Sequence, residues 1–187
     1  MTDNKPSART RILQTAHDLF YRDGIRATGV DRIIQQAGVT KVTFYRHFPA
    51  KNDLILAFLE WRHQRWIRWF HDSLLSQRQQ NHTFPQALAA TLGEWFRSED
   101  FRGCAFINTA VEMADSLPEV LPVIRAHKQN MAEVIGSFIP DDPAPLHAGM
   151  RITLLIDGAI VMAQRDGEAE QAIALLQEWM ADMCRVV

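Results

Sequence analysis

The chain has 187 residues, of which 47% are hydrophobic, and it carries a net charge of −2. A chain of this size and apolar content buries a substantial core, so the composition excludes a disordered protein and allows one domain or two small ones. The two cysteines, Cys104 and Cys184, show no CxxC spacing, which argues against a zinc site or a disulfide framework.

No apolar leader segment is visible at the start of the chain, and the longest apolar stretch, residues 150–163, is interrupted by Arg151 and Asp157. This stretch is shorter than the ~20 residues that a membrane span needs. We therefore expect a cytoplasmic protein.

The charge is distributed unevenly along the chain. Nine of the 20 basic residues and four of the 22 acidic residues lie within residues 1–51, which gives this part a net charge of +5 and leaves −7 for the remainder. A basic N-terminal part on an acidic remainder predicts a polyanionic partner for the N-terminal part alone.

Apolar residues recur at three- and four-residue spacing throughout, and no stretch alternates long enough to favour a strand. In the first predicted helix, Ile12, Ala16 and Leu19 share one apolar face. The helix ends at Gly24, because glycine tolerates the left-handed backbone that commonly follows a helix.

The second predicted helix begins at Thr28, whose hydroxyl is expected to cap it, with Asp31 as the acidic member of a capping box. It ends at Gly38. Thr40 is the predicted cap of a short third helix over residues 41–48, which stops before Pro49 because proline disfavours helical geometry in the residue that precedes it.

A long amphipathic helix from Lys51 is predicted to connect this part to the remainder of the chain. The fold class is therefore all-α with about nine helices, divided into a basic N-terminal domain over residues 1–50 and a larger helical domain over residues 51–187. Further helices are predicted at about residues 84–97, 104–116, 118–139, 144–165 and 167–185.

Two short helices joined by a tight, glycine-containing turn match the helix-turn-helix plan, in which the second helix enters the major groove of DNA. Side chains that point away from Phe44 and Phe48 mix cationic, hydrogen-bonding and small apolar groups. A packed helical pair without DNA is the alternative, which the basic charge disfavours. We predict base contacts from Val42 and Thr43, and phosphate contacts from Lys41, Tyr45, His47 and Lys51.

Residues 12–59 resemble the N-terminal domain of the TetR (tetracycline-repressor-like) family. The resemblance implies three N-terminal helices for DNA and a larger C-terminal domain that dimerises and usually holds a small effector. It also implies that Lys41, Thr43, Tyr45, His47 and Lys51 occupy positions that commonly touch DNA. The pattern that carries the resemblance includes Gly24, Thr28, Ile33, residues 37–39, Phe44, Tyr45, His47, Phe48, Lys51 and Leu54.

Two positions depart from the family pattern. Val42 stands where glycine is frequent, so an apolar contact can replace close backbone approach. Ala50 stands where a serine often caps the next helix. Loss of such a cap typically costs ~0.5–2 kcal/mol, and we expect Asp53 in the first turn of that helix to offset part of it.

Residues 144–163 are apolar nearly all round, which predicts burial on one side by the core and on the other by a partner chain. The last helix offers a second apolar stripe that includes Leu176 and Trp179. By resemblance, these two helices pair with their counterparts in a four-helix dimer interface. A single larger core in a monomer is the alternative.

Large aromatic surfaces with sparse polar groups in the second domain predict a site for an aromatic or amphipathic effector. Plain core packing is the alternative for each aromatic residue. Cys104 lies beside Arg102 near a predicted helix N-terminus, which is compatible either with a thiol sensor or with an inert small residue. The predicted effector-binding residues are Trp66, Phe70, Trp95, Phe106, Asn108, Thr109, Glu112, Met113 and Arg125.

No nucleophile and base pair, glycine-rich phosphate loop or metal-ligand spacing stands out, so we expect no enzyme, cofactor or metal site. The sequence predicts a homodimeric, ligand-responsive transcriptional regulator, most simply a repressor released from a pseudo-palindromic operator by a small aromatic or amphipathic effector. The alternative is a DNA-bound protein whose C-terminal domain recognises a protein partner.

Overall fold

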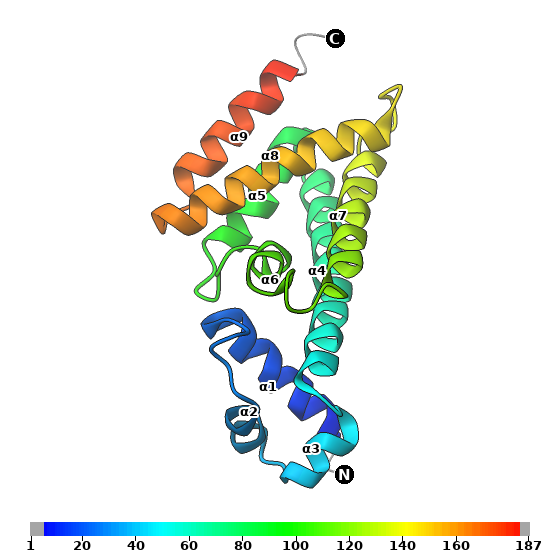
Figure 1. Ribbon diagram of the computed structural model, residues 1–187. Helices are drawn as coiled ribbons and strands as arrows, with labels where there is room; N and C mark the ends of the chain where they lie inside the picture. Colours follow the sequence, from blue (N-terminus) through cyan, green and yellow to red (C-terminus); the bar gives the residue numbers. More distant parts are fainter. Residues whose placement is uncertain (1–5, 184–187) are drawn as a thin grey trace, which may run out of the picture. The chain divides into compact units, whose positions relative to one another are not determined.

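A computed structural model describes residues 6–183, which form nine α-helices and no strand (Figure 1). The prediction of an all-α fold with about nine helices is confirmed. The helices are α1 (Ala8–Asp23), α2 (Val30–Ala37), α3 (Lys41–His47), α4 (Lys51–Gln79), α5 (Phe84–Phe96), α6 (Ala105–Met113), α7 (Val120–Ser137), α8 (Pro145–Asp166) and α9 (Glu170–Met183).

The helices belong to two compact units. One, called the head unit below, comprises Met1–His63 and Ala105–Ile124, and the other, the body unit, comprises Gln64–Cys104 and Arg125–Val187. The head unit therefore contains α6 in addition to α1, α2, α3 and the first part of α4. The predicted domain boundary at residue 50 falls between α3 and α4.

The core of the head unit forms from one apolar face of each N-terminal helix. Ile12 and Leu19 of α1, Ile33 of α2 and Phe44 of α3 are completely buried. Burial of a large aliphatic or aromatic side chain stabilises the fold by about 1.5–3 kcal/mol each. These shared contacts hold the three helices together, and α2 and α3, with 8 and 7 residues, are too short to be stable alone in water.

The turn between α2 and α3 depends on Gly38, which adopts the left-handed conformation with φ of +62°. Its N–H donates to the carbonyl of Gln35 at 3.2 Å. Arg11 of α1 reaches across and donates from Nε to the carbonyl of Ala37 at 3.3 Å. The end of α2 therefore has its free carbonyls satisfied both locally and by α1, which fixes the angle at which α3 leaves.

The predicted cap at Thr28 is wrong. The second helix begins at Val30, its N-cap is Gly29 with no side-chain hydrogen bond, and the predicted capping box is absent. Thr28 is fully buried, and its hydroxyl donates to the carbonyls of Gly24 at 2.8 Å and Leu19 at 3.4 Å. The hydroxyl thus satisfies the carbonyl of Gly24 just after α1, at 2.8 Å, rather than an N–H group at the start of α2.

The start of α4 lacks a capping side chain at Ala50, as expected from the sequence. Asp53, in the first turn, accepts a hydrogen bond from the backbone N–H of Ala50 through Oδ2 at 2.8 Å. This is the reciprocal half of a capping box. Asp53 thus supplies a hydrogen bond at the start of α4, and the free energy that it restores stays a prediction.

In the body unit, α8 buries Ile152, Ile156 and Ile160 along one face. By length and composition, α8 is also the one helix of the described residues that could cross a membrane, with 22 residues and a mean hydropathy of 1.4. Core helices of globular proteins pass the same test, and 44% of the apolar window of α8 is buried. We interpret α8 as a core helix with a second, exposed apolar face.

The buried hydroxyl of Thr28 yields a test of stability. Thr28→Val keeps the shape but leaves the carbonyls of Gly24 and Leu19 without this donor, so we expect a loss of about 1–2 kcal/mol in the free energy of unfolding. Thr153→Val is the matched control, because the buried Thr153 hydroxyl finds no partner within the described part of the chain. Urea denaturation measures both variants. Equal effects of the two substitutions would contradict the role of Thr28.

Candidate functional site

The third helix, α3, is short and is fixed at both ends by its own residues. At its start, the Thr40 hydroxyl accepts a hydrogen bond from the backbone N–H of Thr43 at 3.1 Å. On its inner side, Phe44 is buried and lies near Phe48, with ring centroids 6.3 Å apart. The helix is therefore held rigidly, and its remaining side chains project outward.

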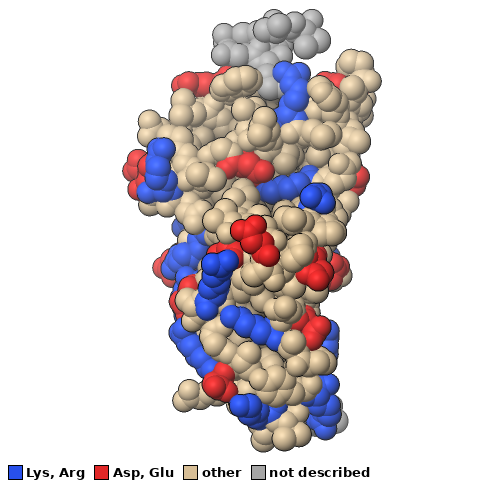
Figure 2. Space-filling view, viewed as in Figure 1, with Lys and Arg blue, Asp and Glu red and all other residues tan. Residues whose placement is uncertain are grey.

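The outward face of α3 is a stripe formed by Lys41, Val42, Tyr45 and Arg46, which are all exposed. Val42 is 79% exposed, which is unusual for a valine and places its methyl groups at the surface. A stripe of cationic, aromatic and small apolar groups at i, i+1, i+4 and i+5 suits phosphates and base edges. Figure 2 shows Lys and Arg side chains at the end of the head unit formed by α2 and α3.

Thr43 and His47, also predicted to contact DNA, are only partly exposed. The hydroxyl of Thr43 lies 2.9 Å from that of Thr40, so the two hydroxyls share a hydrogen bond. Arg46 was not among the predicted contacts, yet it is exposed and has no ion pair among the described residues. The sequence could have indicated Arg46, because it follows Val42 by four residues and therefore lies on the same face of the helix.

Lys51 differs from the other predicted DNA contacts because its ammonium group is already used within the head unit. Its Nζ donates to the carbonyl of Ile25 at 2.6 Å. Partial burial lowers the pKa of Lys51, and the nearby charge of Glu112 opposes this effect. Lys51 thus stabilises the turn after α1, and its predicted phosphate contact remains a prediction.

Three other cations of the head unit, Arg22, Arg32 and Lys41, form ion pairs with aspartates. Arg22 and Arg32 both contact the carboxylate of Asp23 at 2.9 Å, and the bond to Arg22 lowers the pKa of Asp23. Lys41 lies 3.9 Å from Asp31, and this exposed pair contributes little. A phosphate group can therefore replace Asp31 as the partner of Lys41 at low cost.

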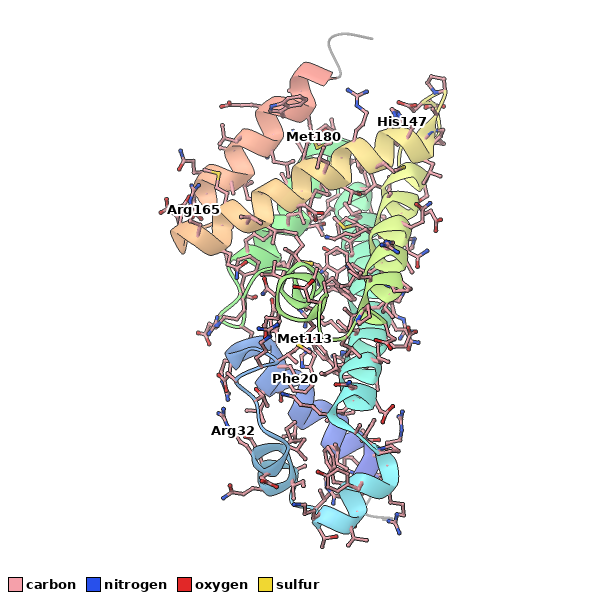
Figure 3. The ribbon with its side chains drawn as sticks, viewed as in Figure 1. Phe20, Arg32, Met113, His147, Arg165 and Met180 are labelled. Atoms are coloured by element: carbon pink, nitrogen blue, oxygen red, sulfur yellow. The ribbon has the colours of Figure 1, made fainter. Side chains whose placement is uncertain are left out.

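The predicted effector residues are divided between the two units. Trp66, Phe70, Trp95 and Arg125 belong to the body unit, whereas Phe106, Asn108, Thr109, Glu112 and Met113 belong to the head unit. In the head unit, the buried Met113 of α6 and Phe20 of α1 both lie where these two helices face each other (Figure 3). Thr109 is buried and donates to the carbonyl of Ala105, while Glu112 binds a backbone N–H as described below.

An aromatic cluster surrounds Trp66 in the body unit. The ring of Trp66 stacks on Phe70 with centroids 4.8 Å apart, and meets Trp95 at 5.4 Å and His127 at 5.2 Å, both edge to face. Trp66 is buried, yet its indole Nε1–H has no hydrogen-bond partner within the described residues. Buried donors are nearly always satisfied in folded proteins, so this N–H has capacity for an acceptor that residues 6–183 do not supply.

Cys104 lies in the body unit immediately before α6. It is a free, buried cysteine, and its Sγ accepts a hydrogen bond from Nζ of Lys128 at 3.6 Å. Lys128 also pairs with Asp157 of α8. The guanidinium of Arg102, which lies beside Cys104 in the sequence, donates to the carbonyls of Glu99 and Phe101. Cys184 lies outside the described residues.

The second face of α8, together with α9, exposes large apolar side chains. Leu154 is 74% exposed and Trp179 is 56% exposed. A groove of about 170 Å³ runs between the two helices. It is lined by Leu155, Gly158, Ala159, Met162, Leu175 and Trp179, among others.

Comparison with known proteins agrees with this geometry. The family model described as bacterial regulatory proteins of the tetR family matches residues 12–58. The solved structure of SCO4454, a TetR-family transcriptional regulator from Streptomyces coelicolor, is 32% identical, with a TM-score of 0.80. The match covers 96% of this chain and 95% of that chain.

Two curated relatives are similar over less than a third of this chain. The nucleoid occlusion factor SlmA of Marinobacter nauticus is 41% identical over 61 residues, which are 32% of this chain and 31% of that protein. The HTH-type transcriptional activator FasR of Mycolicibacterium smegmatis is 42% identical over 52 residues, which are 28% of this chain and 24% of that protein. The chain therefore matches less than a third of the length of either relative.

The exposed stripe on α3 yields a test of DNA contact. Lys41→Ala removes one cation, so we expect weaker binding to all duplexes and a fall of roughly 1 in the slope of log K against log salt concentration. Fluorescence anisotropy with labelled duplexes at several salt concentrations measures this slope. Arg68→Ala, which removes an exposed arginine of the body unit, is the matched control and should leave the slope unchanged. An unchanged slope in Lys41→Ala would exclude a phosphate contact there.

Proposed function

Because this chain belongs to the TetR family of bacterial regulatory proteins, which are DNA-binding transcriptional regulators, we propose that it is a homodimeric repressor. In this proposal, it leaves a pseudo-palindromic operator when a small aromatic or amphipathic effector binds. The observation that carries the proposal is the rigid α3, whose outward stripe combines Lys41 and Arg46 with the exposed Val42.

Each α3 would lie in a major groove, as the second helix of helix-turn-helix proteins does. Two copies in one dimer would then read half-sites about 34–36 Å apart, one helical turn of DNA. Val42 presents methyl groups suited to the methyl of thymine, and the neighbouring cations suit phosphates. The predicted contacts of Thr43, Tyr45, His47 and Lys51 are part of this proposal.

A second copy of the chain would cover the exposed face of α8 and α9. This face supports dimerisation because large apolar side chains rarely gather on the free surface of a monomer. The shallow groove beside Gly158 also leaves open space for a side chain of the partner, since a Cβ at Gly158 would meet nothing within 4 Å.

The effector proposal is supported by the aromatic cluster around Trp66. Flat apolar rings favour an aromatic ligand, and the unsatisfied Nε1–H favours one that carries a hydrogen-bond acceptor. In one conformation of the dimer, the two α3 helices have a spacing that does not fit the operator. The ligand would induce transcription only if it bound this conformation more tightly than the DNA-bound conformation.

The two curated relatives are named as an activator and as a nucleoid occlusion factor, so the direction of regulation needs its own test. Selection of duplexes from a random pool by the purified protein, followed by transcription in vitro from the selected site, tests the proposal. We expect a pseudo-palindromic site and lower transcription when the protein is bound. Activation of transcription from the selected site, or failure to select any site, would contradict the proposed repression. Binding of a protein partner by the body unit would favour the alternative function, a DNA-bound interaction protein.

Leu154→Glu tests the dimer. A carboxylate buried in an apolar interface is costly, so we expect dimer dissociation to increase at least a hundredfold, measured by analytical ultracentrifugation. Val111→Glu is the matched control, because Val111 is 83% exposed on α6 of the head unit. It should remain dimeric. A Leu154→Glu variant that sediments like the unaltered protein would show that this face is not the interface.

Trp66→Phe tests the effector site. It keeps an aromatic ring but removes the N–H. Two probes of similar shape are used: 2-acetylnaphthalene, which has a carbonyl acceptor, and 2-isopropylnaphthalene, which has none. We expect the unaltered protein to prefer the carbonyl probe about tenfold in isothermal titration, and Trp66→Phe to lose this preference.

The control for this experiment is Trp69→Phe, which removes another indole of the same cluster. It should retain the preference for the carbonyl probe. Equal affinity of the unaltered protein for the two probes, or a preference that survives Trp66→Phe, would contradict the assignment of the indole N–H to the effector.

A further inference from the structure

The turn between α1 and α2, residues 24–28, is held by side chains that are distant in the sequence. Lys51 of α4 donates to the carbonyl of Ile25 at 2.6 Å. Glu112 of α6 accepts the backbone N–H of the next residue, Arg26, through Oε2 at 3.0 Å. All of these residues belong to the head unit. Neighbouring peptide groups of one turn are therefore bound from two other helices.

The turn is shaped to receive the carboxylate of Glu112. At Gly24, which has φ of +89°, a Cβ would lie only 3.2 Å from Oε1 of Glu112. Glycine thus provides both the backbone conformation and the space for this contact. A hydrogen bond from an N–H to a carboxylate is about twice as strong as one between neutral groups. Glu112 is also partly buried, which protects the bond from water.

The helix that carries Glu112 is connected to both units. It begins directly after Cys104, the residue at which the chain passes from the body unit to the head unit. Cys104 is buried in the body unit and contacts Lys128 there. Glu112 lies seven residues beyond Ala105, which is about 10 Å along the helix at ~1.5 Å per residue. One end of α6 is continuous with the body unit, and the other end binds the turn.

The turn leads directly into α2, and α2 leads through Gly38 into the DNA-reading α3. We propose that Glu112 is a positioning residue for DNA binding: its carboxylate fixes the turn at residues 24–28, and loss of this contact lowers operator affinity. This inference rests on the proposed DNA-binding function. It gives Glu112, predicted from the sequence to contact the effector, a different role.

Three variants and one control separate the hydrogen bond from the charge. Glu112→Ala removes both, Glu112→Gln keeps an acceptor of the same reach, and Glu112→Asp keeps the charge but is one methylene shorter. Asp115→Asn is the matched control, because it removes one exposed acidic charge just beyond α6. All variants are studied as the full chain.

The first measurement needs no DNA. Hydrogen exchange followed by mass spectrometry reports on the peptide that contains the N–H of Arg26. We expect this exchange to be about tenfold faster in Glu112→Ala and in Glu112→Asp, to be largely restored in Glu112→Gln, and to be unchanged in Asp115→Asn. Equal protection in all variants would overturn the inference, whether or not the protein binds DNA.

The second measurement uses the duplex selected by the unaltered protein, with an unselected duplex of equal length for comparison. We expect Glu112→Ala to bind the selected duplex about tenfold more weakly, with rescue in Glu112→Gln and an unchanged salt dependence, because no phosphate contact is lost. Faster exchange at Arg26 with unaltered operator affinity would overturn the positioning role and leave the proposed function intact. Failure of the unaltered protein to select any duplex would instead overturn the proposed function, while the exchange data would still report on the contact of Glu112.

Discussion

The head unit depends on how the turn between α1 and α2 satisfies its backbone polar groups. A tight turn that leaves a helix has several carbonyl and N–H groups without helical partners, and burying them unpaired costs free energy. Here the Thr28 hydroxyl, the Lys51 ammonium and the Glu112 carboxylate each supply one partner. The position of α2, and through Gly38 that of α3, follows from these three side chains. The position of the exposed stripe on α3 thus depends on polar contacts made by residues outside that helix.

The helices and the inner faces of the head could be predicted from the sequence because they depend on local periodicity. Ile12, Leu19, Ile33 and Phe44 are buried as that periodicity requires, and Asp53 accepts a hydrogen bond from the N–H of Ala50 within a single turn. The prediction failed at Thr28 because a threonine before a helix has two uses for its hydroxyl. Whether it accepts from the next helix or donates to the previous one depends on burial, which local sequence does not determine.

The roles of Lys51 and Glu112 were inaccessible to sequence reasoning for a different reason. Each side chain binds a backbone group that is far away in the sequence. Every residue type carries the same backbone groups, so no sequence pattern indicates which of them a side chain binds. The aromatic cluster in the body unit illustrates the opposite case. The sequence indicates Trp66, Phe70 and Trp95 as large apolar surfaces. Only the structure distinguishes Trp66, whose ring is packed while its N–H has no acceptor in the part of the chain that the structure describes.

The exposed apolar face of α8 and α9 makes protein concentration a variable of this molecule. If the folded chain buries Leu154 and Trp179 only against a second copy, its melting temperature rises with concentration by mass action. A newly synthesised chain then presents that face to any apolar surface until it finds its counterpart. The concentration of this protein in a cell would therefore determine the fraction of chains that stay folded as dimers, as well as the fraction of DNA sites that they occupy.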